Sequence, residues 1–482
     1  MSETVDFDAL TGLTAAAAHF TASLRFEALG DSLPILRRCV LDGLGVALAG
    51  SEQPGMAPLR AHIAETSGAP QARLLGESAP SAPAHLAALW LGCAGHAMDW
   101  DDTQLAEGEG RPYGLLMHPT MPPLAAALTT AELVRRETGE AIDGRRFITA
   151  FAAGFEVGCK IAEAIAPAHY MRGFHTSGTI GTFAAAAAAS NMLGLDTAPT
   201  ATALGIAASM ASGVRANFGT MTKPLHVGRA AENGVTAALL ARKGFSANAE
   251  GLDGRWGYLA IAGPGGDPAS VRDRFGAPFT IVRPGVSIKP YPSGVLTHPS
   301  MDAMRQLMID ERLEASDIAG VLLRAGSNVL GPIRFQLART ELEGKFSFQF
   351  LLAAIILTGR AGKAEFTDAF VSSQACQDMQ GRIETAFDPE VEALGWDKIR
   401  SRLTVTTRDG RVIERWANER YRGGPDHLLS PSELEGKVRD CADGLLDETR
   451  LAALFRDVWA IEDMPDVGLL FDHLAWRSGA DA

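Results

Sequence analysis

Cysteine is scarce in this sequence, with five residues in 482. The five are scattered and form neither a Cys-X-X-Cys pair nor a metal-ligand spacing: Cys39, Cys93, Cys159, Cys376 and Cys441. Disulfides are therefore unexpected, and we predict a reducing, cytoplasmic location. Cys39, Cys93 and Cys159 lie in apolar helical contexts, so we expect buried core thiols there. Cys376 and Cys441 have more polar neighbours, so we make no prediction about whether their thiols are buried.

Basic runs and long apolar runs are missing as well. The formal net charge is −13 and no basic run accompanies it, so we expect no nucleic-acid partner. No apolar run reaches the roughly 20 residues that cross a membrane, so we expect no membrane contact. Residues 1–8 are acidic and lack the positive start and apolar centre of a signal peptide.

What is present is an ordinary globular composition, 46% apolar and 21% charged, in a chain too long for one core. Apolar periodicity predicts helices over most of the chain up to about residue 260. Their ranges are 33–48, 57–66, 82–94, 123–136, 143–166, 200–212 and 227–243. The last of these carries small residues at threefold spacing, Gly228, Ala231 and Gly234, which allow close helix packing.

The spacing of apolar residues changes beyond residues 263–268, which we predict to be a plain loop. Segments 279–282, 320–324 and 403–408 have the pattern of strands, and helices at 300–309 and 346–357 alternate with them. Asp409-Gly410 is a strong hairpin signal because that turn needs positive φ values. We therefore expect a smaller α/β domain over about 275–415 and a return to helix from Ser430.

The polar residues that follow the helix at 82–94 stand out. An apolar, alanine-rich segment runs directly into His96, Asp99, Asp102 and Thr103, and His118 follows after a loop. On a continuing helix, His96, Asp99 and Thr103 would share one face. Burying a carboxylate is costly unless something pairs with it. This stretch therefore needs a polar partner or a ligand.

Two further polar loops precede small-residue helices. Residues 169–179 lead into an alanine-rich helix, whose free backbone N–H groups favour an anion such as a substrate carboxylate. Residues 217–226, with Lys223 and His226, form a second loop ahead of the helix at 227–243. The sequence thus predicts an anion-binding site made from several loops.

A divalent cation is an alternative ligand for the first stretch. Asp99, Asp101 and Asp102 supply the oxygen ligands that Mg²⁺ and Ca²⁺ prefer. Neighbouring residues on one helix diverge, however, and the spacing is not that of a cation-binding loop. We therefore expect no metal.

Five motifs in order make this chain resemble the 2-methylcitrate dehydratase family, MmgE/PrpD. They are GHAMDWDDT with a later HP, GFHTSGTIGTFAAAAAA, KPLHVGRAAENGVTAALLARKGF, KPYPSG followed by His298, and EGKFSFQF. The resemblance implies a mainly α fold: a large all-helical domain formed by both chain ends, with a smaller inserted α/β lid domain. We place the boundaries at 1–272, 273–418 and 419–482. It also implies homodimers, an active site between the domains, and no metal or organic cofactor.

Carried over motif by motif, the resemblance implies catalytic roles for His118, His175, Asp99 and Lys223. It also implies substrate contacts for Thr103 and Lys289. We add Arg172 to the substrate-binding residues from its place in the 169–179 loop alone, without a family counterpart.

The chain departs from the family pattern in three places. Fourteen residues separate Thr103 from His118, a longer loop than expected. The decarboxylase branch has a histidine shortly after the second lysine, where this chain has Tyr291-Pro-Ser-Gly294, and a tyrosine upstream of the EGKFSFQF-like segment that is absent here. These two differences from the decarboxylase branch argue against decarboxylation. Asn217 to Lys223 and His169-Tyr170 resemble the epimerase branch most.

The chemistry of the family suits these residues. A C–H next to a carboxylate is weakly acidic, so lysines and loop N–H groups must neutralise the carboxylate before a base can act. Histidine suits both the acid and the base role, and we expect His118 and His175 to fill them in either order. Asp99 would orient an imidazole or a lysine. We predict a cofactor-free lyase or isomerase acting on a small di- or tricarboxylate, with dehydration ahead of epimerisation and decarboxylation. A non-catalytic anion-binding homologue is the alternative.

Overall fold

The computed structural model describes residues 12–66, 68–77, 79–105 and 117–476. The fold is mainly α, as expected, with only small sheets. The described chain divides into two compact units. The helical unit holds the residues up to Gln104, residues 117–286 and those from Leu434 on, and the sheet unit holds Leu105 and residues 287–433. The domain boundaries expected at 272/273 and 418/419, and the lid role, stay predictions.

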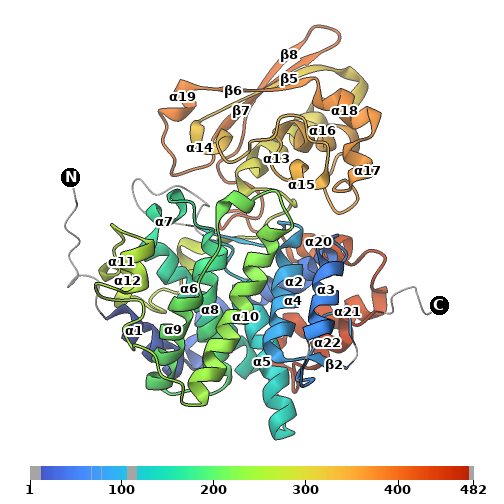
Figure 1. The fold of residues 1–482 in the computed structure, drawn as a ribbon. Helices are drawn as coiled ribbons and strands as arrows, with labels where there is room; N and C mark the ends of the chain where they lie inside the picture. Colours follow the sequence, from blue (N-terminus) through green and yellow to red (C-terminus); the bar gives the residue numbers. More distant parts are fainter. Residues whose placement is uncertain (1–11, 67, 78, 106–116, 477–482) are drawn as a thin grey trace. The chain divides into compact units, whose positions relative to one another are not determined.

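Long helices form the centre of the helical unit (Figure 1). They are α2 (Leu33–Ser51), α4 (Ala84–Ala97), α5 (Met121–Thr138), α6 (Gly144–Ile165), α8 (Thr176–Met192), α9 (Thr197–Met210) and α10 (Thr222–Arg242). α10 packs against α4 and α8, and α8 packs in turn against α6 and α5. These helices are apolar on most sides because they are buried by neighbours on most sides.

Glycines allow α10 to approach its two neighbours closely. A Cβ at Gly228 would lie 2.5 Å from the carbonyl oxygen of Leu89 on α4. A Cβ at Gly234 would lie under 3.0 Å from Ala185 on α8. The small-residue spacing predicted to allow close packing therefore does so on two sides of one helix.

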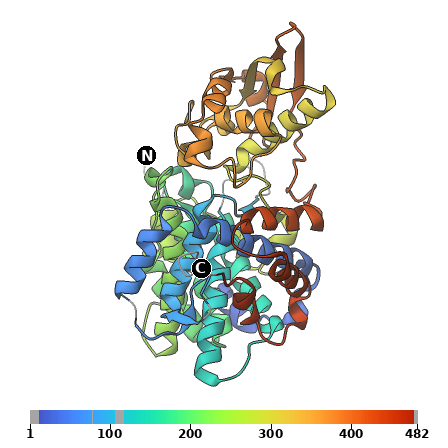
Figure 2. The ribbon, with the colours of Figure 1, turned by 90° about the vertical axis from the view of Figure 1, so that its right-hand side faces the viewer.

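Helices from the two ends of the chain meet in this unit (Figure 2). α20 (Pro431–Ala442), α21 (Glu448–Trp459) and α22 (Leu469–His473) come from the C-terminal part, and α21 packs on α2. Lys437 of α20 lies 2.5 Å from the carboxylate of Asp42 on α2 and donates to the carbonyl of Trp100 at 2.9 Å. All three residues are buried, so the C-terminal helices are fixed to the rest of the unit by charge as well as by apolar packing.

Shorter elements complete the helical unit. They are α1 (Leu13–Ser23), η1 (Phe26–Ala28), η2 (Gly30–Ser32), α3 (Met56–Thr66), β1 (Ala72–Arg73), β2 (Pro80–Ala82), β3 (Thr103–Gln104), α7 (Ala168–Met171), η3 (Arg215–Asn217), α11 (Tyr258–Ala262), α12 (Ala269–Arg272), η4 (Ile281–Gly285) and η7 (Ile461–Asp463). None of the described helices is long and apolar enough to span a lipid bilayer. All five cysteines of the chain are buried and free, including Cys376 and Cys441.

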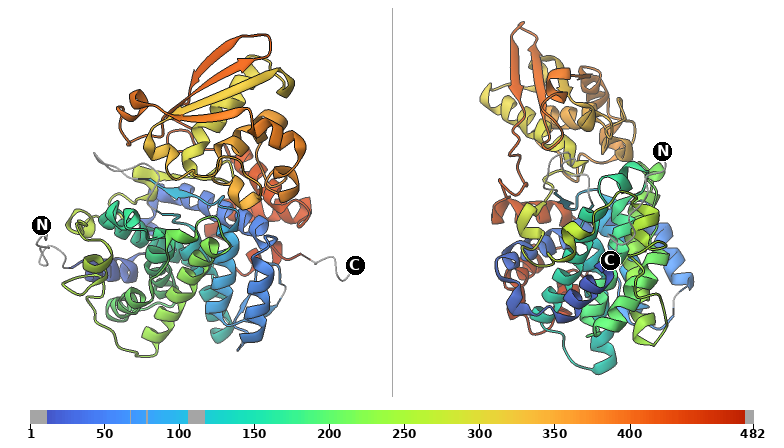
Figure 3. Two further views of the ribbon diagram at one scale, coloured as in Figure 1. Left: turned by 45° about the horizontal axis from the view of Figure 1, so that its top comes forward. Right: turned by 90° about the vertical axis from the view of Figure 1, so that its left-hand side faces the viewer.

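The sheet unit is built on four strands in the order β6-β5-β7-β8 (Figure 3). These are β5 (Ile318–Ala325), β6 (Ile383–Phe387), β7 (Ser401–Thr407) and β8 (Val412–Trp416). β5 pairs with β6 in parallel, and β7 pairs antiparallel with β5 and β8. Gly410 has a φ of 87° in the β7–β8 connection, which confirms the predicted hairpin.

Helices α13 (His298–Asp310) and α16 (Phe348–Thr358) pack on this sheet and on each other. Alternate residues of β7 are buried, as expected for a strand covered on one face. The remaining elements are β4 (Val286–Ser287) at the boundary between the units, η5 (Val295–Thr297), η6 (Ala315–Asp317), α14 (Ser327–Leu330), α15 (Glu341–Gly344), α17 (Asp368–Val371), α18 (Gln374–Gln380) and α19 (Pro389–Glu392).

The strand predicted at 279–282 was wrong. This segment enters η4, a π-helical turn. The carboxylate of Glu156 on α6 accepts hydrogen bonds from the backbone N–H groups of Gly276 (3.0 Å) and Thr280 (2.7 Å). A buried acceptor far away in the sequence thus sets the local backbone, against the strand preference of its β-branched residues.

Candidate active site

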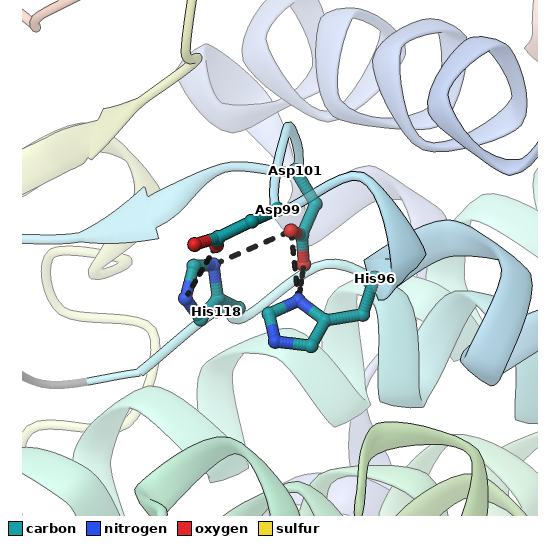
Figure 4. A group of neighbouring side chains, drawn as sticks. All are labelled: His96, Asp99, Asp101 and His118. Atoms are coloured by element: carbon teal, nitrogen blue, oxygen red, sulfur yellow. Dashed lines mark hydrogen bonds and ion pairs between the residues drawn. The ribbon is translucent and has the colours of Figure 1, made fainter. Parts of the chain in front are cut away.

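The chain turns sharply after α4. Asp99 has a φ of 53°, in the left-handed region that aspartate enters more readily than most residues. The expectation that His96, Asp99 and Thr103 share one face of a continuing helix was therefore wrong. The turn instead gathers the side chains of Asp99, Asp101, His96 and His118 into one cluster (Figure 4).

His96, in the last turn of α4, is held by Asp101. Its Nδ1 lies 2.9 Å and 3.0 Å from the two carboxylate oxygens, and both side chains are buried. The same carboxylate lies 3.5 Å from Nδ1 of His118. Asp101 therefore stands beside two imidazoles and favours a proton on the nitrogen of each that faces it.

His118 is fixed through both its backbone and its ring. Its backbone N–H donates to Oγ of Ser177 at 2.9 Å, and its Nδ1 lies 2.8 Å from the carbonyl oxygen of Asp102. A carbonyl only accepts, so Nδ1 carries the proton and Nε2 of the neutral ring carries a lone pair. Nε2 lies 3.7 Å from Oδ1 of Asp99. His118 therefore has the tautomer of a base.

Lys223 lies in the first turn of α10, because that helix begins at Thr222 and not after the expected loop. Its Nζ is 3.0 Å from Oδ1 of Asp99, and it lies 5.3 Å from the centroid of the Phe218 ring. Both charged side chains are more than nine-tenths buried. Each charge compensates the other, so the pair tolerates burial that neither group would tolerate alone.

His175 precedes the first residue of α8 and is nearly inaccessible to solvent. Its Nδ1 lies 3.0 Å from Nδ1 of His226, whereas its Nε2 is buried and has no hydrogen-bond partner among the described residues. Burial, followed by the charges of His96 and Lys223, lowers the pKa of His175 well below its usual value. The ring is therefore neutral at pH 7.

The ring of His96 contacts both imidazoles that we expect to act as acid and base. Its centroid lies 4.5 Å from that of His118 and 5.6 Å from that of His175. With the Asp99–Lys223 pair, four predicted catalytic residues lie in one buried cluster of the helical unit. Their catalytic roles stay predictions.

Asp102 contacts His118 of the cluster through its carbonyl oxygen, and Thr120 holds its carboxylate. Its carboxylate accepts from the backbone N–H and the hydroxyl of Thr120 at 3.2 Å and 2.6 Å. Burial raises the pKa of Asp102 to about 7, and the neighbouring carboxylates of Asp101 and Asp42 act in the same direction. Near neutral pH this side chain therefore exchanges between its two protonation states, while its carbonyl holds His118.

The three predicted substrate-binding residues have different surroundings. Thr103, in β3, is buried, and its hydroxyl has no hydrogen-bond partner within the described chain. Arg172 is exposed after α7; burial lowers the pKa of His169, and the charge of Arg172 acts in the same direction. Lys289 is buried and belongs to the sheet unit. Substrate contacts of all three stay predictions.

His96, Asp101 and His226 belong to the cluster but were not among the predicted site residues. His226 lies three residues after Lys223, so an earlier helix start would have placed both on neighbouring positions of one face. The pairing of His96 with Asp101 depends on the left-handed backbone at Asp99, for which the sequence carries only a weak signal.

The cluster has the residue types of a metal site but not its geometry. His96, Asp99, Asp101 and His118 each offer a ligand atom, and these atoms lie within 4.8 Å of one another. Ligands of one zinc ion, at bonds of ~2.1 Å, lie only about 3.4 Å apart. Asp99 already faces the ammonium group of Lys223, and Nδ1 of each histidine is engaged by an oxygen. The donor set therefore fits an acid–base site better than a metal site.

Two family models match this chain. The MmgE/PrpD N-terminal domain matches residues 15–270, and the MmgE/PrpD C-terminal domain matches residues 291–461. The chain belongs to the MmgE/PrpD family. The family indicated by the five sequence motifs is thereby confirmed.

Relatives of this MmgE/PrpD chain include decarboxylases and a dehydratase. Cis-aconitate decarboxylase of Homo sapiens is 27% identical over 440 residues, covering 90% of this chain and 88% of the relative. Cis-aconitate decarboxylase of Aspergillus terreus is 24% identical and covers 98% of both chains. 2-Methylcitrate dehydratase of Cupriavidus necator is 26% identical over 411 residues, covering 78% of this chain and 79% of the relative.

Proposed function

We propose that this chain is a cofactor-free lyase that dehydrates a small di- or tricarboxylate by removing a proton from the carbon next to a carboxylate. The observation that carries the proposal is the contact of Nδ1 of His118 with the carbonyl oxygen of Asp102, which leaves the lone pair of the neutral ring on Nε2, in a cluster with a second imidazole, His175, and the Lys223–Asp99 pair. A base, an acid and a cation are what removal of such a proton requires.

In the proposed reaction, His118 takes the proton from carbon, and the C–H electron pair becomes the new C=C bond. The C–O bond breaks with its electron pair on oxygen, which takes a proton from the acid and leaves as water. Lys223 stabilises the charge that develops on the substrate carboxylate. We assign substrate binding to the hydroxyl of Thr103 as well, because it is buried and has no hydrogen-bond partner within the described chain.

Decarboxylation is a second candidate because relatives named cis-aconitate decarboxylase cover nearly the whole chain. Against it stand Tyr291-Pro-Ser-Gly294, where that branch has a histidine, and the lack of a tyrosine between Tyr291 and Phe350, where that branch has one. Both candidates need the same acid–base pair, so the products must decide between them.

A panel of hydroxylated and unsaturated di- and tricarboxylates, incubated with the protein in D₂O and followed by NMR, tests the proposal. Net alkene formation supports dehydration, release of CO₂ supports decarboxylation, and α-deuteration without net change supports an epimerase. No change in any acid of the panel would contradict catalysis and leave an anion-binding protein.

The variant His175→Ala gives this assay its specificity. Loss of the acid or base typically lowers the rate about 10²–10⁴-fold, so activity should nearly vanish while the circular dichroism spectrum stays unchanged. His19→Ala is the matched control, because His19 is an exposed histidine of α1. Near-normal turnover of His175→Ala would remove that residue from the site.

We also propose a homodimer in the cytoplasm. An exposed apolar patch formed by Phe245, Trp256 and Ile261, which are 58%, 80% and 62% exposed, supports a second protein surface in this region. Light scattering after gel filtration tests the proposal. A dimer that Trp256→Ser converts to a monomer supports it, and a wild-type monomer contradicts it.

A further inference from the structure

The contact between His175 and His226 is an unusual one for a buried pair. Their Nδ1 atoms lie 3.0 Å apart, and the ring centroids 5.2 Å. Two N–H groups would repel at this distance, and so would two lone pairs. One proton must therefore lie between the two nitrogens, and the tautomer of either ring dictates that of the other.

Both rings are neutral in this environment. Burial, together with the charge of Lys223, lowers the pKa of each, and His96 and His118 act on His175 in the same direction. A neutral pair has two arrangements. If His226 donates, His175 carries its remaining proton on Nε2. If His175 donates, its Nε2 carries a lone pair.

His226 packs closely against the backbone at two glycines. A Cβ at Gly178, in the first turn of α8, would lie 2.8 Å from Cβ of His226. A Cβ at Gly213, where φ is 144°, would lie 3.3 Å from its Cγ. The backbone N–H of His175 donates to the carbonyl of Gly213 at 3.1 Å, so the same loop seats both rings.

The tautomer of His118 decides between the two arrangements. The carbonyl of Asp102 fixes the proton of that ring on Nδ1, which makes Nε2 of His118 a base. The proposed reaction also needs an acid that donates to the leaving oxygen. Nε2 of His175 is buried and unpartnered among the described residues, so it is the free position from which an acid can act.

We propose that His226 is the positioning residue that holds His175 as the Nε2–H tautomer, which assigns the acid to His175 and the base to His118. This assignment rests on the proposed function. A neutral imidazole is a weak acid by itself, so its Nε2 proton can leave only as another arrives. His226 supplies that proton from its Nδ1 to Nδ1 of His175, and takes one from solvent on its own Nε2. No charge is left in the buried pair.

His226 is suited to this exchange because it keeps 9% of its surface exposed, against 3% for His175. The proton that His118 removes from carbon returns to solvent. After the product leaves, the relay runs back: Nε2 of His175 takes a proton from water in the emptied site, Nδ1 of His175 returns its proton to Nδ1 of His226, and Nε2 of His226 releases one to solvent, so protons balance and both tautomers are restored. A wrong tautomer is costly: in a serine protease triad it lowers the rate about 10⁴-fold.

Two variants of similar size separate the tautomer from the proton relay. His226→Asn places an amide N–H near the position of Nδ1 and can still hold the Nε2–H tautomer of His175, but an amide cannot pass a proton on, whereas the ionised carboxylate of His226→Asp can only accept. We expect both variants to lower kcat by about 10² or more with KM little changed, because the relay is lost in each. A kcat close to wild type in either folded variant would contradict the proposal.

Long-range ¹H–¹⁵N correlation spectra give a readout independent of activity. The signals of His175 are assigned by their loss in His175→Ala. In wild type at pH 7 we expect a protonated Nε2 and an unprotonated Nδ1 at His175, reversed in His226→Asp. An unprotonated Nε2 in wild type overturns the proposal even if neither His226 variant folds. A correct tautomer in a protein inactive on every acid overturns the proposed function alone.

Discussion

At the scale of single residues, the site is defined by charges that burial makes dependent on one another. Oδ1 of Asp99 lies near both Nζ of Lys223 and Nε2 of His118, in a region almost without solvent. Burying two opposite charges as a pair costs little free energy, whereas burying either charge without its partner costs much more. Their stability contribution and their chemical role should therefore respond differently to substitution.

Lys223→Met tests this dependence. The buried carboxylate of Asp99 would lose its cation, and we expect the free energy of unfolding to fall by about 3–5 kcal/mol in urea denaturation. Adding Asp99→Asn should restore most of that loss but no turnover. Lys243→Met, an exposed lysine just beyond the same helix, should change stability by less than about 0.5 kcal/mol. If Lys223→Met had the same free energy of unfolding as wild type, the ion pair would make no contribution to stability.

Asp102→Asn tests the raised pKa of that carboxyl. Its pKa is about 7 in the folded protein and near 3.8 when unfolded, so its ionisation makes the folded state less favourable as pH rises between these values. A neutral amide avoids this cost. The variant should therefore gain stability relative to wild type as pH rises from 4 to 8, by on the order of 1–3 kcal/mol. A difference that does not vary with pH in parallel denaturation series would contradict the shift.

At the scale of elements, the close approach of α10 to α4 and α8 depends on glycines. Gly234→Ala would force a methyl group against Ala185, and overpacking of this kind costs about 1–3 kcal/mol. Gly436, exposed within α20, has open space around it, because a Cβ added there would meet no described atom within 4 Å outside the adjacent residues and backbone of its own helix. Gly436→Ala should therefore stabilise the protein by about 0.5–1 kcal/mol. Thermal unfolding of both variants should show opposite signs, and equal shifts would contradict the packing argument.

Elements fixed by local periodicity could be predicted from the sequence. The apolar spacing of α5, α6 and α16 and the Asp409-Gly410 turn were sufficient, because each is decided by neighbours in the chain. The start of α10 was placed too late, because residues 222–226 form its first turn, where Pro224 is tolerated. β6 was missed because it exists through parallel pairing with β5, about 60 residues earlier.

The same limit applies to the site. The motifs were sufficient to select His118, His175, Asp99 and Lys223, which the helical unit gathers. The sequence could not supply their partners, since those depend on one left-handed residue and on a seat lined by glycine. Such features arise from tertiary structure and leave little periodic signal.

At the scale of the whole molecule, buried neutral histidines make stability depend on pH. Burial lowers the pKa of His169 to about 4, while its ring is held by the carbonyl of Ala262 and the hydroxyl of Thr179, each at 2.8 Å. In the unfolded chain this group takes up a proton near pH 6.5. The unfolded state therefore binds more protons than the folded state between about pH 6.5 and 4, and stability falls as pH falls through that window.

We expect His169 alone to contribute about 3 kcal/mol to this loss. His169→Asn, which does not titrate, should flatten the dependence of unfolding free energy on pH in that window, whatever its effect at pH 8. Asp102 acts in the opposite sense, so combining His169→Asn with Asp102→Asn should leave a slope close to wild type. An unchanged slope in the single variant would contradict a neutral His169.

The contact of Lys437 with Asp42 and with the carbonyl of Trp100 imposes an order of events on biosynthesis. Its three members are separated by almost the length of the chain, and the lysine is translated last. While the ribosome is still producing the sheet unit, the nascent helical unit lacks the ammonium group that neutralises Asp42. The turn that carries Asp99 and Asp101 therefore gains this contact, through the carbonyl of Trp100, only after α20 has emerged from the exit tunnel.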